Sequence, residues 1–308
     1  DSWITDVPQQ STRHIMVMEP VAFRANEQTR STNSYQSDNP DNLNPVQEAA
    51  KSEFRGLRDT LAEAGVIMTT TLGKHDCPDD VFCNNWVSTH LNDDGKRSMV
   101  LYPMLADNRR TERRPELIEW LGRSYETALD LSQYENSNKY LESTGSLAMD
   151  RVNKRAFCAL SSRSDQELAE KFCENMGYEL HRFQTENHEG KPVYHTDVMM
   201  FIGTGYIGIC LECILPEDRK RILSEVEKYH TVIELSMEQL RQFAGNALEI
   251  RGGSGQTFLA MSNAAEQSLT PTQKQNIRKH VTDILSAPIP TIEKYGGGSV
   301  RCMLLELH

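Results

Sequence analysis

The chain lacks an excess of positive charge, and this shortage narrows the partners that it can bind. Its 33 basic and 44 acidic residues leave a formal net charge of -11. Nucleic acid is therefore not expected as a partner, because contacts with phosphates need clustered Lys and Arg. A short basic run at residues 109–114 is interrupted by Glu112 and does not reverse that expectation.

Long apolar runs and a cysteine framework are also missing. No apolar stretch approaches the roughly 20 residues that span a membrane, so we expect no membrane partner. Residues 1–6 do not place a basic segment before an apolar one, which is the pattern of a secretory signal. The seven cysteines are odd in number and scattered, in a chain too large to need disulfides. We therefore expect free thiols and a reducing, cytoplasmic location.

What the chain does contain is a recurrent alternation of apolar runs and amphipathic stretches. Hydrophobic residues make up 38% and charged residues 25%, as in ordinary globular proteins. Strands or short extended segments are predicted over residues 15–23, 66–71, 98–102, 145–149, 156–160, 178–183, 197–202, 206–210, 231–235, 247–250, 256–260, 291–292 and 299–307. Helices are predicted over residues 45–64, 115–131, 164–176, 216–228 and 271–285, the third capped by Ser164.

A unit of two strands, a helix and a strand therefore recurs about five times. An ordinary mixed α/β sheet would give the same periodicity, so that alternative stays open. No linker-like change in composition divides the chain, which favours a single domain over residues 15–308 after an N-terminal extension of residues 1–14. The polar loop over residues 24–45 is long for a compact domain and is either a lid or poorly ordered.

The most informative stretch lies near the C-terminus, where Cys302 follows the glycines at 296–298 and precedes an apolar run. Glycines let the backbone approach another group closely. We expect the final strand to deliver Cys302 to the centre of the molecule as a nucleophile. The alternative is a small buried hydrophobic side chain. Cys210 and Cys213 have the spacing of a metal pair, but they lie in a strand-like run without a second ligand pair, so no metal is expected.

Three further stretches carry polar residues at predicted strand ends. His195 and Asp197 would point to one face of a strand, and Glu142 precedes the glycine turn at Gly145. The amides Asn84 and Asn85 follow two acidic residues in a polar loop. Each has an ordinary structural explanation, such as a solvated turn or an Asx-rich loop. Their coincidence at the ends of different units favours one shared site.

Taken in order, these stretches form a recognisable set: PDDVFCNNWVSTH, LYPM..NRR.ER, LE.TGS...DR, SSR, VYHTD, FAGNALE and GGGSVRC. The set resembles the amidinotransferase, or guanidine-modifying (pentein), superfamily. Within it, the similarity is to the arginine-deiminase-related subgroup that includes citrulline-utilising hydrolases. The resemblance runs from about Ile15 to the C-terminus. It implies a five-bladed α/β propeller of ββαβ modules around a central active-site channel.

The resemblance also implies the catalytic roles. Cys302 corresponds to the nucleophile that attacks the central carbon of a guanidino or ureido group. His195 corresponds to the general acid and base, and Glu142 to the carboxylate that orients the site and holds substrate N–H groups. A covalent adduct on sulfur is then hydrolysed, which splits one difficult step into two.

Substrate-binding roles follow in the same way. Asp197 corresponds to a second carboxylate that binds substrate N–H groups, and Arg109 and Arg163 to the arginines that clamp the α-carboxylate. Asn33, in the long polar loop, corresponds to a substrate-contacting lid residue. The resemblance implies a small amino acid as the partner and neither cofactor nor metal. A homo-oligomer remains open.

Asn84 and Asn85 depart from the family pattern, because acids stand there in dimethylarginine hydrolases and an aspartate in deiminases. A buried cation that loses its partner costs roughly 3–5 kcal/mol, so these amides favour a neutral ureido group. We therefore expect citrulline to be converted to ornithine, CO₂ and ammonia. The alternatives are an arginine deiminase or dihydrolase, a dimethylarginine hydrolase, an amidinotransferase and a non-catalytic pentein binding protein.

Overall fold

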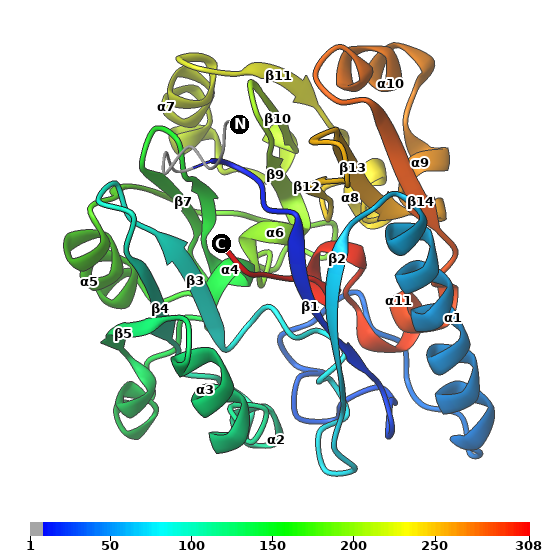
Figure 1. The fold of residues 1–308 in the computed structure, drawn as a ribbon. Helices are drawn as coiled ribbons and strands as arrows, with labels where there is room; N and C mark the ends of the chain where they lie inside the picture. Colours follow the sequence, from blue (N-terminus) through cyan, green and yellow to red (C-terminus); the bar gives the residue numbers. More distant parts are fainter. Residues whose placement is uncertain (1–8) are drawn as a thin grey trace.

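The computed structural model describes residues 9–308, in which five three-stranded sheets surround a common centre (Figure 1). The strands are β1 (His14–Glu19), β2 (Ile67–Leu72), β3 (Val87–Leu91), β4 (Arg97–Leu101), β5 (Glu126–Asp130), β6 (Ala148–Asp150), β7 (Arg155–Ala159), β8 (Glu179–Phe183), β9 (Met200–Ile202), β10 (Tyr206–Ile209), β11 (Thr231–Glu234), β12 (Leu248–Arg251), β13 (Thr257–Ser262), β14 (Asp283–Ala287) and β15 (Leu305–Glu306).

Helices connect these strands, and most of them are short. The α-helices are α1 (Asn44–Glu63), α2 (Asp107–Arg110), α3 (Pro115–Gly122), α4 (Ser143–Ser146), α5 (Gln166–Met176), α6 (Thr196–Met199), α7 (Pro216–Glu227), α8 (Met237–Arg241), α9 (Asn263–Ser268), α10 (Pro271–Arg278) and α11 (Pro290–Gly296). The 3-10 helices are η1 (Ser132–Ser137), η2 (Leu211–Cys213) and η3 (Val300–Met303).

All five sheets are built on the same plan. The first strand runs antiparallel to the middle one, and the third runs parallel to it after a helical crossover, as in β6–β7–β8 with α5 between the last two. The sheet β15–β1–β2 joins both ends of the described chain, because Ile15 of β1 pairs with Glu306 of β15. This arrangement is the five-bladed α/β propeller of ββαβ modules predicted from the sequence.

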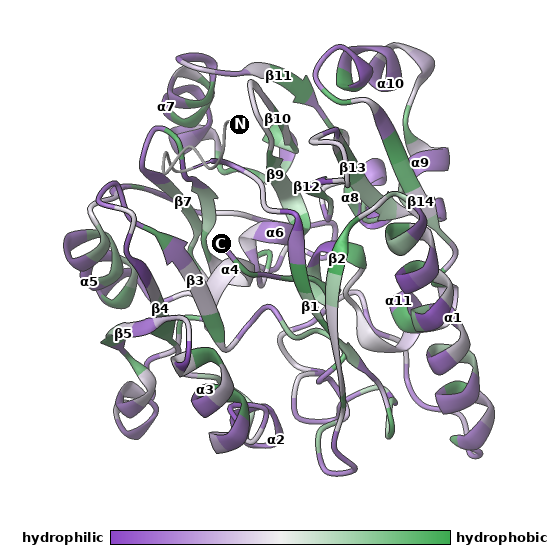
Figure 2. Ribbon diagram, viewed as in Figure 1, coloured by the Kyte–Doolittle hydropathy of each residue, from purple (hydrophilic) through white to green (hydrophobic). Residues whose placement is uncertain are grey.

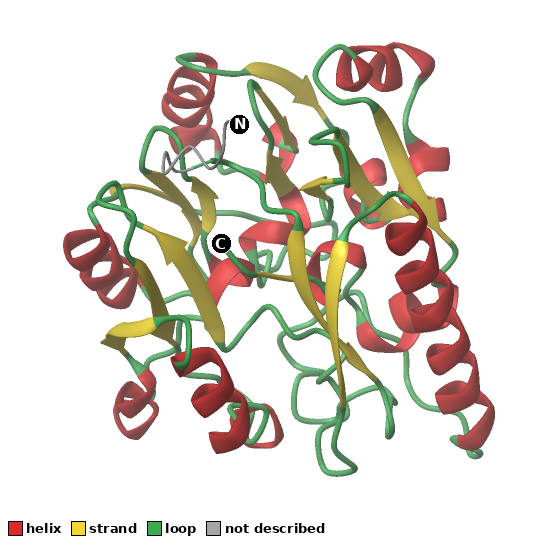
Figure 3. Cartoon of the chain, in the orientation of Figure 1, coloured by secondary structure: helices red, strands yellow, loops and turns green. Residues whose placement is uncertain are grey.

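The longer helices lie around the outside of the sheets, as Figure 3 shows. In α1 the buried residues recur with helical spacing, at Val46, Ala50, Phe54, Leu57 and Leu61. Each of these side chains except that of Ala50 contributes about 1.5–3 kcal/mol when it leaves water. Figure 2 shows hydrophilic residues along much of the outer helices, whereas the strands carry both hydrophilic and hydrophobic residues. The apolar cores therefore lie between helices and sheets, and the centre is left for polar side chains.

Three short helical turns occupy this centre: α4, α6 and η3 (Figure 1). The prediction of continuous strands over residues 145–149, 197–202 and 299–307 was therefore wrong in the first half of each. In α4 the Ser146 hydroxyl accepts from the backbone N–H of Glu142 at 2.8 Å, a local bond that competes with strand pairing. Consequently Cys302 lies in η3, ahead of the final strand, and Asp197 lies in α6.

Two predicted helices were too long, because each absorbed a strand that follows it. The helix predicted over residues 115–131 ends at Gly122 and is followed by β5, and the helix over residues 271–285 ends at Arg278 and is followed by β14. Both strands lie at the outer edge of their sheets, where β5 is largely exposed and lacks the alternation of a half-buried strand.

Smaller corrections concern single turns and caps. Strand β3 (VSTHL) is buried along most of its length but carries three polar residues in its middle, so it shows no clear apolar alternation and was not predicted. Asp165, rather than Ser164, caps α5, because its side chain accepts from the N–H of Leu168. Residues 291–292, predicted to be extended, lie within α11.

The described part of the N-terminal extension, residues 9–14, and the long polar loop both pack on the body of the protein. Gln10 donates to the carbonyls of Met149 and Ile202 at 2.9 and 3.2 Å, while residues 1–8 lie outside the described part of the chain. Residues 24–43 form no helix or strand, yet Thr29 and Asn33 are buried. No helix within residues 9–308 is long and apolar enough to cross a membrane.

Candidate active site

Cys302 lies in a closed environment formed by three different modules. Its Sγ is 3.3 Å from Nδ2 of Asn246 and 3.4 Å from Oδ2 of Asp197. The Asn246 amide also donates to the carbonyl of Asp197 at 2.8 Å, which ties the two neighbours together. At Gly297, just before η3, φ is +66°, and an added Cβ would lie 2.5 Å from Nδ2 of Asn33. The glycine run is thus needed for close approach, as predicted.

The electrostatic environment keeps this cysteine protonated in the free protein. Burial, and then the Asp197 carboxylate, raise the pKa of the Cys302 thiol far above its ordinary value. The thiol therefore donates to Asp197, whose own pKa is raised by burial. A nucleophilic thiolate would have to form after a substrate has changed these surroundings.

His195 and Glu142 form a buried pair beside the cysteine. Nε2 of His195 lies 2.7 Å from Oε1 of Glu142, and the second carboxylate oxygen accepts from the N–H of Leu105 at 2.9 Å. Burial by itself would raise the pKa of Glu142, but Arg163 and the hydrogen bond from His195 lower it to about 2. Glu142 is thus a permanently charged anchor that fixes the imidazole ring.

The other face of the imidazole is closely packed. Nδ1 of His195 lies 4.0 Å from Oδ1 of Asp197, so the two residues meet although Asp197 is helical and the predicted strand geometry was wrong. A Cβ at Gly145 would lie 2.5 Å from Nδ2 of Asn85 and 2.8 Å from Nδ1 of His195. Glycine in the turn after Glu142 therefore lets the ring and the amide approach each other.

Asn84 and Asn85 form a hydrogen-bonded chain that ends at Asp197. Nη1 of Arg109 donates to Oδ1 of Asn85 at 2.8 Å, and Nδ2 of Asn85 donates to Oδ1 of Asn84 at 2.8 Å. Nδ2 of Asn84 then donates to Oδ2 of Asp197 at 3.1 Å. Since a guanidinium group has only donors, Arg109 sets the orientation of both amides.

Arg109 is largely committed to the protein itself. It forms a two-pronged pair with Glu112, at 2.8 and 3.1 Å, and also donates to the carbonyl of Phe82 at 2.9 Å. Burial raises the pKa of Glu112 to about 7 in spite of this arginine. Arg109 therefore acts at least partly as a buried support for Asn85.

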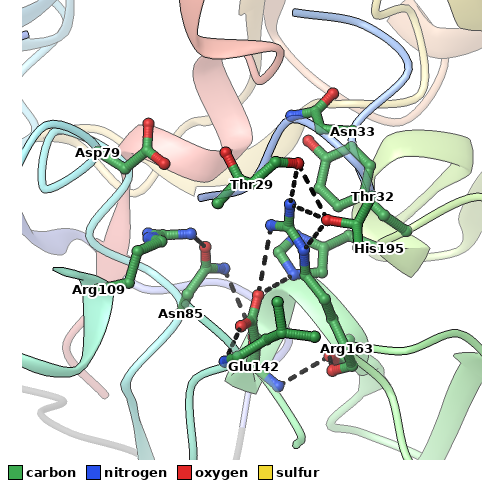
Figure 4. A network of polar contacts seen from close by, with 12 residues as sticks. Thr29, Thr32, Asn33, Asp79, Asn85, Arg109, Glu142, Arg163 and His195 are labelled. Carbon is green, nitrogen blue, oxygen red and sulfur yellow. Dashed lines mark hydrogen bonds and ion pairs between the residues drawn. The ribbon is translucent and has the colours of Figure 1, made fainter. Parts of the chain in front are cut away.

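Arg163 joins the loop of residues 24–43 to the site, as Figure 4 shows. Its guanidinium donates to Oγ1 of Thr32 at 2.7 and 3.0 Å and lies 3.6 Å from Oε1 of Glu142. It also lies over the ring of Tyr194, 4.6 Å from the centroid. Asn33 donates to the carbonyls at positions 296 and 297, both at 3.3 Å, so this loop covers the turn that leads to Cys302.

These residues surround a small cavity with a volume of only about 10 Å³. The cavity is lined by the predicted residues Asn33, Asn85, Arg109, Arg163, His195 and Cys302. All nine predicted site residues are buried, and the structure brings them together around this space. Asn84, Glu142 and Asp197 lie behind its wall, bonded to residues that form it.

The sequence reasoning missed Asp79, Tyr194 and Asn246. Asp79 and Tyr194 line the cavity, and Asn246 contacts Cys302. Each stands in a motif that carried the family resemblance, but an acid, a tyrosine and an amide in such motifs have no spacing that separates them from ordinary loop residues. Asp79 Oδ1 and Asp197 Oδ1 are buried without a hydrogen-bond partner in the described structure, so both could accept from a ligand.

Within residues 9–308, no group of three His, Cys, Asp or Glu side chains is placed to bind a metal ion. All seven cysteines are free and buried, in line with the expectation of free thiols. At the candidate metal pair, the thiol of Cys213 donates to the carbonyl of Cys210 at 3.1 Å.

Comparison with solved structures shows relatives of the same fold. The N-terminal domain of ArgZ, an arginine dihydrolase from the ornithine–ammonia cycle in Cyanobacteria, matches 95% of this chain and 97% of that domain, with a TM-score of 0.75 and 15% identity. AgrE bound to L-arginine matches 96% of this chain with a TM-score of 0.73 and 18% identity, although this chain spans only 40% of AgrE. A dimethylarginine dimethylaminohydrolase adduct matches 96% of this chain and 99% of its own, with a TM-score of 0.65 and 18% identity.

Comparison with family models shows to which family the chain belongs. No curated protein matches this chain. The model for eukaryotic N,N dimethylarginine dimethylhydrolase matches residues 19–308, nearly all of the described chain. Together with the shared fold, this match agrees with the resemblance found in the sequence. The chain therefore belongs to the N,N-dimethylarginine dimethylhydrolase family, whose members are cysteine-dependent hydrolases of the pentein superfamily.

Proposed function

We propose that this protein hydrolyses the ureido group of citrulline and releases ornithine, CO₂ and ammonia. The observation that carries this choice is the amide chain that runs from Arg109 along the cavity wall to Asp197, which contacts Cys302. Nδ2 of Asn84 donates one N–H to Asp197, and its second N–H has no partner among the described residues. A ureido oxygen can accept from that N–H, whereas a guanidinium group offers no acceptor.

The remaining groups fit the other end of an amino acid. Asp79, with an unpaired buried oxygen, suits the α-ammonium group, and Arg163 and Arg109 suit the α-carboxylate. Asp197 Oδ1 suits an N–H of the ureido group. Asn33 covers the substrate from the loop. Residues 15–308 would then form one catalytic domain that β15 closes.

The proposed reaction proceeds in two stages. Sγ of Cys302 loses its proton to Asp197, whose Oδ2 lies at 3.4 Å. The sulfur then forms a bond to the ureido carbon. His195, held by Glu142, protonates the departing nitrogen as its bond to carbon breaks. His195 then takes a proton from a water that attacks the carbonyl carbon of the S-linked thiocarbamate. The C–S bond breaks as Sγ of Cys302 regains its proton from Asp197. The carbamic acid that is released splits into CO₂ and the second amine, so that ornithine and ammonia are both formed.

Arginine is the second candidate substrate, and one observation favours it. Asp197 has a raised pKa and an unpaired oxygen, so a guanidinium cation would compensate its charge. Arginine would then be taken through two hydrolyses to ornithine, as the name arginine dihydrolase of the structural relative ArgZ suggests. Methylated arginines, the substrates named for the family, are the third case.

A product assay separates these candidates. The purified protein is given citrulline, arginine or dimethylarginine, and ornithine, citrulline and ammonia are quantified, with Cys302→Ala as the blank. We expect ornithine to form from citrulline and not from arginine or dimethylarginine. Citrulline formed from arginine, without ornithine from citrulline, would overturn the proposal. Tight binding of these compounds without turnover would instead point to a non-catalytic binding protein.

A further inference from the structure

A second and larger cavity lies apart from the site, and its lining is strongly basic. Its volume is about 710 Å³, and none of its lining residues lines the cavity at Cys302. Six of the lining side chains are cationic: Arg13, Arg97, Arg123, Arg151, Lys154 and Arg251. The described lining contains neither Asp nor Glu, in a chain whose formal net charge is -11. Such a concentration of positive charge in an acidic protein favours the binding of an anion.

Among residues 9–308, few negative charges compensate the positive charges in this cavity. Among the six, Arg151 alone lies within 4.0 Å of a described carboxylate, at 3.7 Å from Oε1 of Glu306. Burial, and then the nearby Arg13, lower the pKa of Arg251. Burial, and then Arg151, lower the pKa of His308 to about 4. The cationic groups thus repel one another, and a bound anion would relieve that repulsion.

The shape of the cavity and its aromatic residues narrow the class of anion. Its volume lies within the roughly 300–1,000 Å³ that is typical of small-molecule sites. Guanidinium groups suit phosphate because they can donate two parallel hydrogen bonds. Trp120 and Tyr125 also line the cavity, and Trp120 is one of the exposed large apolar side chains of the described chain. An exposed indole offers a flat face on which an aromatic base can stack.

We propose that this cavity binds a small molecule that combines phosphate groups with an aromatic base, of the nucleoside polyphosphate class. Arg97 and Arg123 lie at the exposed rim and attract the phosphates, and Arg151 lies in the buried floor. Trp120 contacts the base. A cavity of this size suits one nucleotide rather than the extended backbone of a nucleic acid. The proposal is independent of the substrate of Cys302.

Calorimetric titration of the whole protein with ATP and with pyrophosphate tests this site. Arg97→Glu/Arg123→Glu removes cations from the exposed rim, so folding should be preserved. Arg241→Glu/Lys220→Glu makes the same change in net charge on exposed residues that do not line the cavity. We expect saturable binding of both ligands, weakened at least about tenfold by the first pair and less than about twofold by the second. Trp120→Ala should weaken ATP binding and leave pyrophosphate binding unchanged.

Three outcomes would overturn the proposal. The first is no saturable binding of either ligand up to about 5 mM. The second is equal weakening by both pairs of substitutions, or displacement of the ligand by citrulline or ornithine, which would place binding elsewhere. The third is a single-stranded oligonucleotide that binds more tightly than ATP and is lost with Arg97 and Arg123, which would make the face a nucleic-acid surface.

Discussion

Nη1 of Arg109 lies 2.8 Å from Oδ1 of Asn85, and this contact fixes which way the asparagine amide faces. The oxygen must meet the guanidinium, so the NH₂ group turns toward Asn84 and imposes a matching orientation on its amide. A charged residue at the rear of the site thereby fixes the hydrogen-bonding orientation of both amides. Glu112 holds Arg109 in place from the other side.

The first prediction concerns Asn84→Asp, which replaces a donor with a second carboxylate beside Asp197. The two carboxylates would repel, and a cationic substrate would relieve that repulsion. Losing a hydrogen bond that involves a charged group costs about 1.5–3 kcal/mol, so kcat/KM for citrulline should fall roughly 10- to 100-fold. Relative preference should shift toward arginine, measured by ornithine and citrulline formation from each substrate.

Asn84→Ala is the matched control, because it removes the donor without adding charge. It should lower citrulline turnover without raising the arginine-to-citrulline ratio. If Asn84→Asp turned over citrulline at the unaltered rate, the amide would not be part of the ureido-binding group.

The second prediction concerns the reactivity of Cys302. Because burial and the Asp197 carboxylate raise its pKa, the free protein should be alkylated slowly by iodoacetamide at pH 8. Asp197→Asn removes the negative charge that opposes the thiolate, so alkylation at Cys302 should become roughly tenfold faster. Mass spectrometry of the labelled peptide gives the rate. An unchanged rate in Asp197→Asn would mean that burial alone controls the thiol.

The recurrent unit and the composition of the site could be read from the sequence, whereas the local geometry could not. Helix α1 was predicted because its apolar residues recur on one buried face. Strands β5 and β14 were predicted as parts of the preceding helices, because apolar and polar residues do not alternate clearly in these edge strands. The turns α4 and α6 were read as strands, since their helical geometry depends on contacts with each other across two modules.

The same distinction applies to individual site residues. Cys302 was found because glycines at 296–298 signal close approach, and the structure places that turn against Asn33. Asp79 and Asn246 gave no such signal. Their importance arises from long-range placement, which leaves Asp79 Oδ1 buried without a partner and brings Asn246 to within 3.3 Å of the cysteine. No spacing in the sequence encodes those distances.

The third prediction uses the charge of Glu142. Its pKa is lowered from 4.5 to about 2 in the folded protein, so it stabilises the fold above pH 4.5 and loses that effect as the pH falls toward 2. The shift corresponds to about 3 kcal/mol. Glu142→Gln should therefore be less stable than the unaltered protein at pH 6, by an amount that shrinks toward pH 3. Urea unfolding at several pH values measures the difference, and a constant gap would contradict the assignment.

The last prediction concerns Gly145, where space rather than charge is decisive. In Gly145→Ala the added Cβ would lie 2.5 Å from Nδ2 of Asn85 and 2.8 Å from Nδ1 of His195, so at least one of them must move. A displacement of this kind near reacting groups lowers kcat by about 100-fold.

Gly56→Ala in α1 is the matched control, since an added Cβ there meets nothing within 4 Å. It should leave kcat unchanged and stabilise the protein by roughly 0.5–1 kcal/mol, because alanine favours a helix over glycine. Steady-state kinetics and thermal unfolding of both variants give the comparison. Full activity in Gly145→Ala would show that His195 and Asn85 can move apart without harm. The close packing of these two side chains against Gly145 would then have no catalytic importance.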